Sequence, residues 1–248
     1  MQNIKYSVII PAYNEEKIIG STIDKLVEFM HNFNKEFELI VANDGSADST
    51  PHIVTARLEK IPELRLVSNP KNMGRGAVLT NAFNSAKGEI CIYIDADLSI
   101  DLELFPKLMS AIENGADIAI GSKHIKGAQV EYPLLRRIAS KGYAFMATLL
   151  LGSTIYDYQC GFKAFKSDVI KKLLPLVKEQ GWSWDTEILV KAEWLNCNIV
   201  ELPAKVVNVF ERESKVHLFR DINRMGSGLM KLWREKRQFI NQQHSLDK

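Results

Sequence analysis

Residues 89–99 restrict the fold of this chain more than any other part of its sequence. Five consecutive apolar residues, 90–94, predict a short strand that is buried on both faces of a sheet. The strand runs directly into Asp95-Ala96-Asp97, and two carboxylates cannot stay unpaired in a dry core. They must therefore emerge at the carboxyl end of the strand, where open α/β sheets bind ligands. Such a pair can hold Mg²⁺, whereas the simpler interpretation is a polar loop with two solvated aspartates.

The first half of the chain alternates predicted strands with predicted helices. Strands are expected over 6–11, 37–42, 64–67, 89–94 and 118–120. Five alternations predict an α/β fold with a doubly wound, mainly parallel sheet. The second half is expected to elaborate the same domain over 1–217, followed by a basic amphipathic helix and tail over 218–248. Its expected elements are helices over 134–151, 167–177, 186–195 and 218–238, and strands over 161–165, 199–202 and 206–210.

Composition excludes several classes of protein. A hydrophobic content of 46% allows a sizeable core, and a net charge of +2 gives no reason to expect nucleic acid as a partner. The amino terminus lacks the pattern of a signal peptide, and the longest apolar stretch, 144–151, is too short to span a bilayer. These features predict a cytoplasmic chain that is soluble or peripheral. Positive charge is concentrated near the carboxyl end, with eight Lys or Arg against three Asp or Glu over 212–237.

Polar side chains also follow the first two predicted strands. Tyr13 and Glu15 come after the first strand, and Asp44 comes after the second. Because the carboxyl ends of parallel strands share one edge of a sheet, these side chains are expected near Asp95 and Asp97. Asp44 and Glu15 could accept hydrogen bonds from a nucleobase or ribose, and Tyr13 could stack on the base. Each residue also has a simpler interpretation. Asp44 can be a turn residue, Glu15 can interact with the dipole of the following helix, and Tyr13 can pack in the core.

Four motifs follow one another along the first half of the chain: Val8-Ile9-Ile10-Pro11-Ala12-Tyr13-Asn14-Glu15, Asn43-Asp44-Gly45-Ser46, Asn72-Met73-Gly74-Arg75-Gly76 and Asp95-Ala96-Asp97. Their order resembles that of family 2 glycosyltransferases, and the resemblance covers about residues 5–216. This resemblance implies the GT-A fold, a single nucleotide-binding α/β domain with its nucleotide-sugar site at the strand carboxyl ends. It also implies that Mg²⁺ or Mn²⁺ binds Asp95 and Asp97. The donor-binding residues it implies are Pro11, Tyr13, Glu15, Asp44, Arg75, Asp95, Ala96, Asp97, Arg212 and Lys215.

The second half carries four further motifs: Gly121-Ser122-Lys123, Arg136-Arg137-x-x-Ser140-Lys141-Gly142, Asp157-x-Gln159-Cys160-Gly161-Phe162-Lys163 and Arg212-x-Ser214-Lys215. They are similar to motifs of the dolichyl-phosphate sugar synthases. Those enzymes move mannose or glucose from a nucleotide donor, GDP-mannose or UDP-glucose, to a polyprenyl phosphate, in an inverting single displacement. By this resemblance Asp97, Arg136 and Lys123 are catalytic, and Arg136, Arg137, Ser140 and Gln159 bind the acceptor.

Two positions depart from the family pattern. Asn43 replaces the usual first acid of Asp-Asp-Gly-Ser, and Ser99 stands where many mannosyl members carry Gln. A third metal ligand is therefore left open. Residues 157–163 and 184–187 look closer to the glucosyl branch.

Two other functions are compatible with the same motifs. A glycosyltransferase that uses a saccharide hydroxyl needs a general base, for which Asp185 or Glu187 is available, but the chain lacks the Gln-x-x-Arg-Trp motif of many such enzymes. The other interpretation of Asp185 is an acid at a helix amino terminus. A non-catalytic module that binds nucleotide sugars is the second alternative, and the retained Asp95 and Asp97 argue against it.

Two segments could bring the chain to a lipid acceptor. The helix over 134–151 either receives the isoprenoid chain or lies in the core. The helix over 218–238 has apolar residues at three- and four-residue spacing among basic ones, which suits either an interfacial helix on anionic lipid or a docked surface helix. A membrane-embedded partner subunit is the other means of reaching the membrane.

Overall fold

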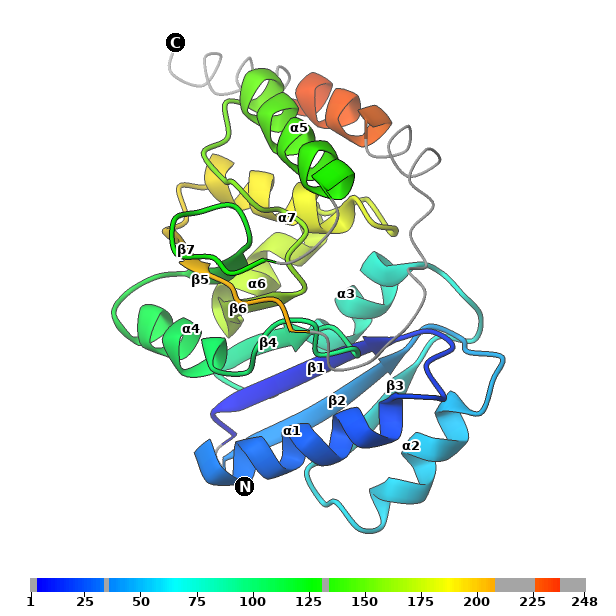
Figure 1. Cartoon of the computed structure of the whole chain (residues 1–248). Helices are drawn as coiled ribbons and strands as arrows, with labels where there is room; N and C mark the ends of the chain where they lie inside the picture. The colour runs from blue at the N-terminus through cyan, green and yellow to red at the C-terminus, as the bar shows by residue number, and fades with distance from the viewer. Residues whose placement is uncertain (1–3, 34–35, 131–133, 208–225, 237–248) are drawn as a thin grey trace.

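The computed structural model describes residues 4–33, 36–130, 134–207 and 226–236, with the backbone alone over 134–140. Strands and helices alternate through the first half as expected, and Figure 1 shows their arrangement. The elements are β1 (Tyr6–Ala12), α1 (Ile19–Phe33), β2 (Phe37–Asn43), α2 (Thr50–Leu58), β3 (Leu64–Ser68), α3 (Arg75–Ser85), β4 (Ile90–Ile94), α4 (Leu104–Glu113), β5 (Ile118–Ser122), α5 (Leu134–Leu151), β6 (Phe162–Lys166), α6 (Ser167–Leu173), η1 (Leu174–Leu176), α7 (Trp184–Trp194) and β7 (Ile199–Pro203).

The seven strands form one sheet in the order β3-β2-β1-β4-β6-β5-β7 (Figure 1). Neighbouring strands are parallel except where β6 pairs with β4 and β5, because β6 runs antiparallel to both. The prediction of a mainly parallel α/β sheet is therefore confirmed. The carboxyl ends of β1, β2 and β4 meet at one edge, beside the amino end of β6.

Helices cover both faces of the sheet, which explains why its central strands are apolar throughout. Alternate residues of a strand point to opposite faces, so Val8 and Ile10 enter one core while Ile9 enters the other. Helices α1, α2 and α4 contribute to the first core, and α3, α5, α6 and α7 contribute to the second. Strands β1, β2 and β4 are buried along their whole length. This is the doubly wound arrangement that their sequences predict.

The described part of the carboxyl-terminal segment is a docked helix over 226–236. Leu229 and Leu232 are each 3% exposed and join the second core. The Lys236 ammonium donates to the Leu151 carbonyl, so this helix lies against the end of α5 (Figure 1). The structure thus favours the docked surface helix over a free interfacial helix for these residues. Residues 218–225 and 237–238 of the expected helix, and the expected boundary at 217, lie outside the described residues.

The expected strand over 206–210 is reduced to one bridge in the part that the structure describes. Val206 bridges to Ile100, and residues 208–210 lie outside the described residues. Across the described residues, no helix is both long enough and apolar enough to cross a membrane.

Helix α5 has an apolar outer face as well as an apolar inner one. Ala147 and Leu151 are buried in the second core, so one face of this helix packs against the domain. On the outside, Phe145 and Leu149 are 66% and 68% exposed, one helical turn apart. Met146 beside them is also exposed. Large side chains gathered on one face in this way mark a surface that contacts lipid or another protein.

Candidate functional site

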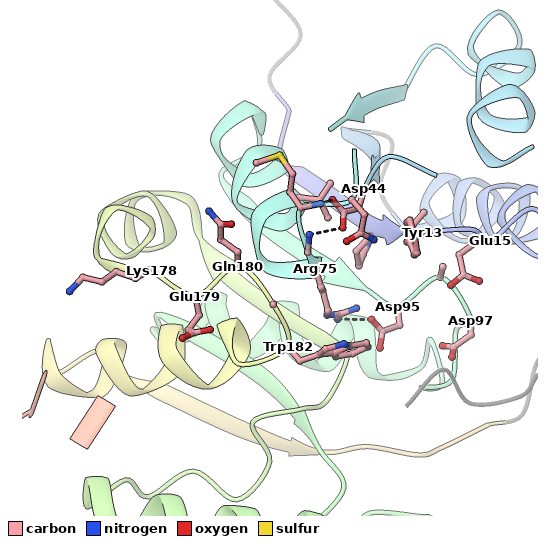
Figure 2. A pocket seen from close by; sticks show the side chains of 18 of the residues that line it. Tyr13, Glu15, Asp44, Arg75, Asp95, Asp97, Lys178, Glu179, Gln180 and Trp182 are labelled. Carbon is pink, nitrogen blue, oxygen red and sulfur yellow. Dashed lines mark hydrogen bonds and ion pairs between the residues drawn. The ribbon is translucent and has the colours of Figure 1, made fainter. Parts of the chain in front are cut away.

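A cavity of about 660 Å³ lies at the carboxyl ends of β1, β2 and β4 (Figure 2). Its position is the one that α/β sheets use for ligands, because loops diverge there and leave a crevice. Eight of the ten predicted donor-binding residues line it, whereas Arg212 and Lys215 lie outside the described residues. The residues from the sheet side are Pro11, Ala12, Tyr13, Glu15, Asp44, Asn72, Met73, Gly74, Arg75, Val78, Asp95, Ala96 and Asp97.

Asp44 anchors the loop that closes one side of the cavity. Its Oδ1 accepts hydrogen bonds from the Asn69 amide (2.8 Å) and the Met73 N–H (2.9 Å), and its Oδ2 accepts from the Gly74 N–H (2.8 Å). The side chain is only 3% exposed, yet it lines the cavity. The sequence allowed Asp44 to be either a turn residue or a ligand-binding residue. In the structure it holds the loop by hydrogen bonds and also lines the cavity. Charge-assisted bonds to three donors fix its position.

Asn43 stands at the position of the first acid of the family motif and is held by two hydrogen bonds. Its Oδ1 accepts the Ser46 N–H at 3.1 Å, and its amide donates to the Ser68 hydroxyl at 3.2 Å. Asn43 is 3% exposed and does not line the cavity. The amide supplies an acceptor for the Ser46 N–H and a donor for the Ser68 hydroxyl, so both of its ends are hydrogen-bonded.

The turn after β1 is pinned to the loop after β2. Asn14 adopts the left-handed conformation (φ 54°), and its side chain accepts the Ala47 N–H at 2.9 Å. The Glu15 N–H donates to the Thr50 hydroxyl at 2.8 Å. These contacts hold Tyr13, which is 40% exposed, on the cavity wall. A side chain that is 40% exposed is not part of the core, so core packing is excluded for Tyr13.

Asp95 and Asp97 emerge at the tip of β4 and line the cavity, as their sequence predicts. The Asp95 N–H donates to the Gly161 carbonyl (2.9 Å) at the start of β6. The Asp97 Oδ1 accepts the Ser99 N–H at 3.1 Å. Ser99 thus orients Asp97 through its backbone.

Arg75 faces the acidic pair from the first turn of α3 (Figure 2). Its Nη2 lies 2.6 Å from Asp95 Oδ1, and its Nε lies 3.6 Å from Asp185 Oδ2. Burial opposes the charged form, but the carboxylates of Asp95 and Asp185 raise the pKa of Arg75 above its usual value. The guanidinium is therefore a permanent cation on the cavity wall.

The opposite wall is a segment that sequence reasoning did not identify. Residues 178–182 line the cavity, and Trp182 is 42% exposed within it. The buried Glu187 accepts the N–H groups of Lys178 (3.0 Å) and Glu179 (2.7 Å), so α7 fixes the start of this segment. Lys231 of the helix 226–236 pairs with Glu179 at 3.0 Å and also lines the cavity. The only sequence signal is Gly181-Trp182 immediately before a helix, which is weak by itself.

Asp185 does not lie where a general base must lie. It is 2% exposed, and it does not belong to the cavity lining. The Lys163 ammonium donates to its Oδ1 at 2.8 Å, and the Tyr93 hydroxyl donates to the same oxygen. Burial favours the neutral acid, but the charges of Lys163 and Arg75 prevail and lower the pKa of Asp185. The hypothesis that Asp185 is the base is therefore wrong for this geometry.

Lys123 does not line this cavity, and its predicted catalytic role stays a prediction. Its ammonium lies 3.3 Å from the buried carboxylate of Asp157, which also accepts the Lys123 N–H at 2.9 Å. Gln159 lies closer to the cavity, since its amide donates to the Trp182 carbonyl at 3.4 Å. The predicted acceptor residues Arg136, Arg137 and Ser140 lie in α5, where only the backbone is described.

The acidic pair fits a hard divalent cation that keeps open coordination positions. Within the described residues, no group of three or more His, Cys, Asp or Glu side chains gathers as a closed metal cage. Mg²⁺ and similar ions need only one or two protein carboxylates when substrate phosphates complete the shell. Asp95 Oδ1 is paired with Arg75 at 2.6 Å, and the Asp95 side chain stays 31% exposed on the cavity wall, so its carboxylate can also face a ligand. Asp97 lines the same cavity and can supply the second carboxylate.

The sequence matches a family model and is similar to the sequences of several known proteins. A family model described as "Glycosyl transferase family 2" matches residues 7–174. The glycosyltransferase AglD of Haloferax volcanii is 34% identical over 233 residues, which cover 93% of this chain and 37% of that protein. A dolichyl-phosphate beta-glucosyltransferase of Trichomonas vaginalis is 34% identical over 220 residues, covering 84% of this chain and 65% of that protein. The dolichol-phosphate mannosyltransferase of Pyrococcus furiosus is 33% identical over 205 residues, covering 81% and 56%.

This chain therefore spans between 37% and 65% of the length of these three relatives. Among solved structures, it is similar to glucosyl-3-phosphoglycerate synthase from Mycobacterium tuberculosis in complex with Mn²⁺, uridine diphosphate and phosphoglyceric acid. The TM-score is 0.68 at 20% identity, over 94% of this chain and 78% of that one. At this identity the likeness supports the fold, and it agrees with the predicted GT-A architecture.

Proposed function

Because the chain belongs to glycosyltransferase family 2, we propose that it transfers a hexose from a nucleoside diphosphate sugar to a polyprenyl phosphate, with inversion. The observation that carries this proposal is the acidic pair Asp95 and Asp97 on the wall of one cavity with Tyr13 and Asp44. The names of the relatives support the substrate classes: dolichyl phosphate as the acceptor, and glucose or mannose as the hexose. The donors to be tested are UDP-glucose and GDP-mannose.

The donor is bound across the cavity. Tyr13 stacks on the nucleobase, and Asp44 and Glu15 accept hydrogen bonds from the base or ribose. Arg75 faces the diphosphate, where its fixed charge and planar fork suit phosphate oxygens. Arg212 and Lys215 are proposed to join the donor site from outside the described residues.

Transfer is a single displacement at the anomeric carbon. An oxygen of the acceptor phosphate forms the new bond, and the bond from the anomeric carbon to the donor diphosphate breaks. Asp97 and Asp95 would hold a divalent cation, which would supply a Lewis acid for the charge on the leaving diphosphate. Arg75 adds a second positive charge on the same side of the cavity. A phosphomonoester is already anionic near pH 7, so no general base is required.

That last point separates the proposal from transfer to a saccharide hydroxyl. A hydroxyl must lose its proton during attack. The candidate bases Asp185 and Glu187 are each 2% exposed, and they are paired with Lys163 and Lys191, respectively. The structure therefore favours an acceptor that arrives deprotonated. We propose that Arg136, Arg137, Ser140 and Gln159 bind that phosphate.

The acceptor carries a long isoprenoid chain, so the protein must work at a membrane. We propose that it lies peripherally on the cytoplasmic face, with the outer face of α5 against lipid. Phe145, Met146 and Leu149 supply exposed apolar area there, whereas Leu229 and Leu232 are used in the core. A membrane-embedded partner that covers the same face is the alternative occupant.

A radiolabel transfer assay tests the proposed function. The chain is incubated with labelled GDP-mannose or UDP-glucose, dolichyl phosphate and Mg²⁺ or Mn²⁺, and the lipid product is extracted into organic solvent. We expect label in the organic phase with one donor, and its loss on chelation of the metal or in Asp97→Ala. Transfer to a soluble saccharide instead would show a hydroxyl acceptor. Tight donor binding without transfer or hydrolysis would show a non-catalytic binding module.

A further inference from the structure

Lys163 and Asp185 are buried charges that the proposed chemistry does not use directly. Lys163 is 0% exposed and Asp185 is 2% exposed, and their charged atoms lie 2.8 Å apart. Taking two charges out of water is so costly that an apolar pair of the same volume is often as stable. Fold stability alone therefore does not account for an ion pair directly behind the cavity wall.

The Lys163 ammonium uses all three of its protons. It donates to Asp185 Oδ1, to the Tyr93 hydroxyl (2.7 Å) and to the Cys160 carbonyl (2.6 Å). The Tyr93 hydroxyl then donates its own proton to Asp185 Oδ1. One oxygen of Asp185 is thus fixed from two sides. Its other oxygen, Oδ2, is the one that lies near Arg75.

Arg75 is held on four sides. Asp95 lies in front of the guanidinium and Asp185 behind it, at 2.6 and 3.6 Å. The centroids of the Tyr93 and Trp182 rings lie 5.3 and 5.5 Å from its central carbon, a distance typical of cation–π contacts. Because Arg75 stands in the first turn of α3, the helix dipole repels its charge. The two carboxylates offset that repulsion.

We infer that Lys163 and Asp185 are positioning residues which hold the Arg75 guanidinium toward the donor diphosphate, a role that rests on the proposed function. The need for them follows from the double use of Asp95. When Asp95 contacts a cation or the donor, its attraction for Arg75 is shared and weakened. Asp185 does not line the cavity, so its attraction persists when the donor binds. The ion pair of Lys163 with Asp185 in turn keeps that carboxylate charged and in place.

A double-mutant cycle on nucleotide binding tests the role. Binding of UDP and of GDP is measured by calorimetry with Mn²⁺ for the full chain, Arg75→Ala, Asp185→Asn and the double variant. Loss of the guanidinium should raise the Kd of the nucleotide that binds by roughly 10- to 100-fold. Asp185→Asn should raise it by about 3- to 20-fold in the full chain, and by less than about twofold when Arg75 is already absent.

Tyr93→Phe is a second variant that does not leave a buried charge unpaired. It keeps the ring beside Arg75 and removes only the hydroxyl that fixes Asp185, so the Kd should rise by a smaller factor that also vanishes without Arg75. The matched control is Glu38→Gln, a carboxylate that is also 2% exposed and bonded to Ser7 and Arg65 at the amino edge of the sheet. Its nucleotide affinity should match that of the unmodified chain.

The results separate this role from the proposed function. Equal effects of Asp185→Asn with and without Arg75, or no effect of either Asp185→Asn or Tyr93→Phe, would overturn the positioning role alone. A loss of affinity in Glu38→Gln equal to that in Asp185→Asn would show a general consequence of destabilisation and would also overturn it. Failure of the unmodified chain to bind either nucleotide would overturn the proposed function and the positioning role together.

Discussion

A single methyl group added at Gly161 should displace the acidic pair. A Cβ at this position would lie 1.8 Å from Asp95 Oδ2, whereas ordinary contact begins at 3.4 Å. The carboxylate would have to move by about 1.6 Å, since the backbones cannot separate. The Asp95 N–H donates to the Gly161 carbonyl, and the strands pair from Ile94 with Phe162 onward. A shift of this size also breaks the contact of Asp95 with Arg75, which is 2.6 Å long.

Gly161→Ala should therefore impair function far more than stability. Overpacking of this kind costs about 1–3 kcal/mol of unfolding free energy. Misplacement of a binding group by about 1 Å costs on the order of 100-fold in rate, so we expect kcat/KM for the donor to fall by about 100-fold or more. The effect should appear in donor turnover whichever nucleotide sugar is used.

The assay is lipid-extracted product formation, with thermal unfolding measured on the same preparations. Gly115→Ala is the matched control, because Gly115 has a φ of 106° and no atom within 4 Å of an added Cβ. It precedes β5 at the edge of the sheet opposite the cavity. Strain from its left-handed backbone should cost about 1 kcal/mol and leave turnover unchanged. Near-normal turnover in Gly161→Ala would refute the claim that the position of Asp95 matters.

Three further outcomes follow from the site and its surroundings. Asp97→Ala should abolish transfer and change the unfolding free energy by less than about 1 kcal/mol; turnover that persists and does not depend on Mg²⁺ or Mn²⁺ would contradict the metal role. Arg136→Lys or Arg137→Lys should raise the acceptor KM roughly tenfold, since lysine keeps the charge and loses the fork, and leave the donor KM unchanged; a change confined to the donor KM would exclude the assignment. Burial of one exposed apolar side chain in the membrane contributes about 1.5 kcal/mol or more to the free energy of membrane binding. The double variant Phe145→Glu with Leu149→Glu should therefore lower sedimentation with phosphatidylglycerol vesicles by more than about tenfold. Unchanged sedimentation would exclude α5 as the anchor.

Local pattern was sufficient to predict one half of the cavity. The strand before Asp95 and Asp97 is short, apolar and followed at once by charge, and these features belong to adjacent residues. Tyr13 and Asp44 follow strands of the same kind, so the rule that parallel strands share an edge was enough to bring them together. The order and direction of the strands were enough to place these residues at one cavity.

The other half depends on packing that no local pattern encodes. Helix α7 is buried on nearly every side, so it lacks the alternation of apolar and polar residues that reveals which face is inward. The acid at its start was therefore open to two interpretations. The ion pair of Asp185 with Lys163 in β6 decides between the two interpretations, and the sequence does not reveal that contact. Lys231 reaches the cavity from a separate helix, and sequence spacing carries no signal of that contact.

The position of β6 has a consequence for the order in which the chain assembles during synthesis. Among the strands that the structure describes, β1 to β4 pair with one another and, through β4, with β6, so four adjacent strands of the sheet can form once the ribosome has passed β4. β5 has no such option, because both of its neighbours, β6 and β7, are made later. Its apolar residues Ile118, Ala119 and Ile120 therefore stay without a paired strand until β6 has been synthesised. Nascent chains that end between β5 and β6 should therefore be the ones that bind chaperones and aggregate most readily.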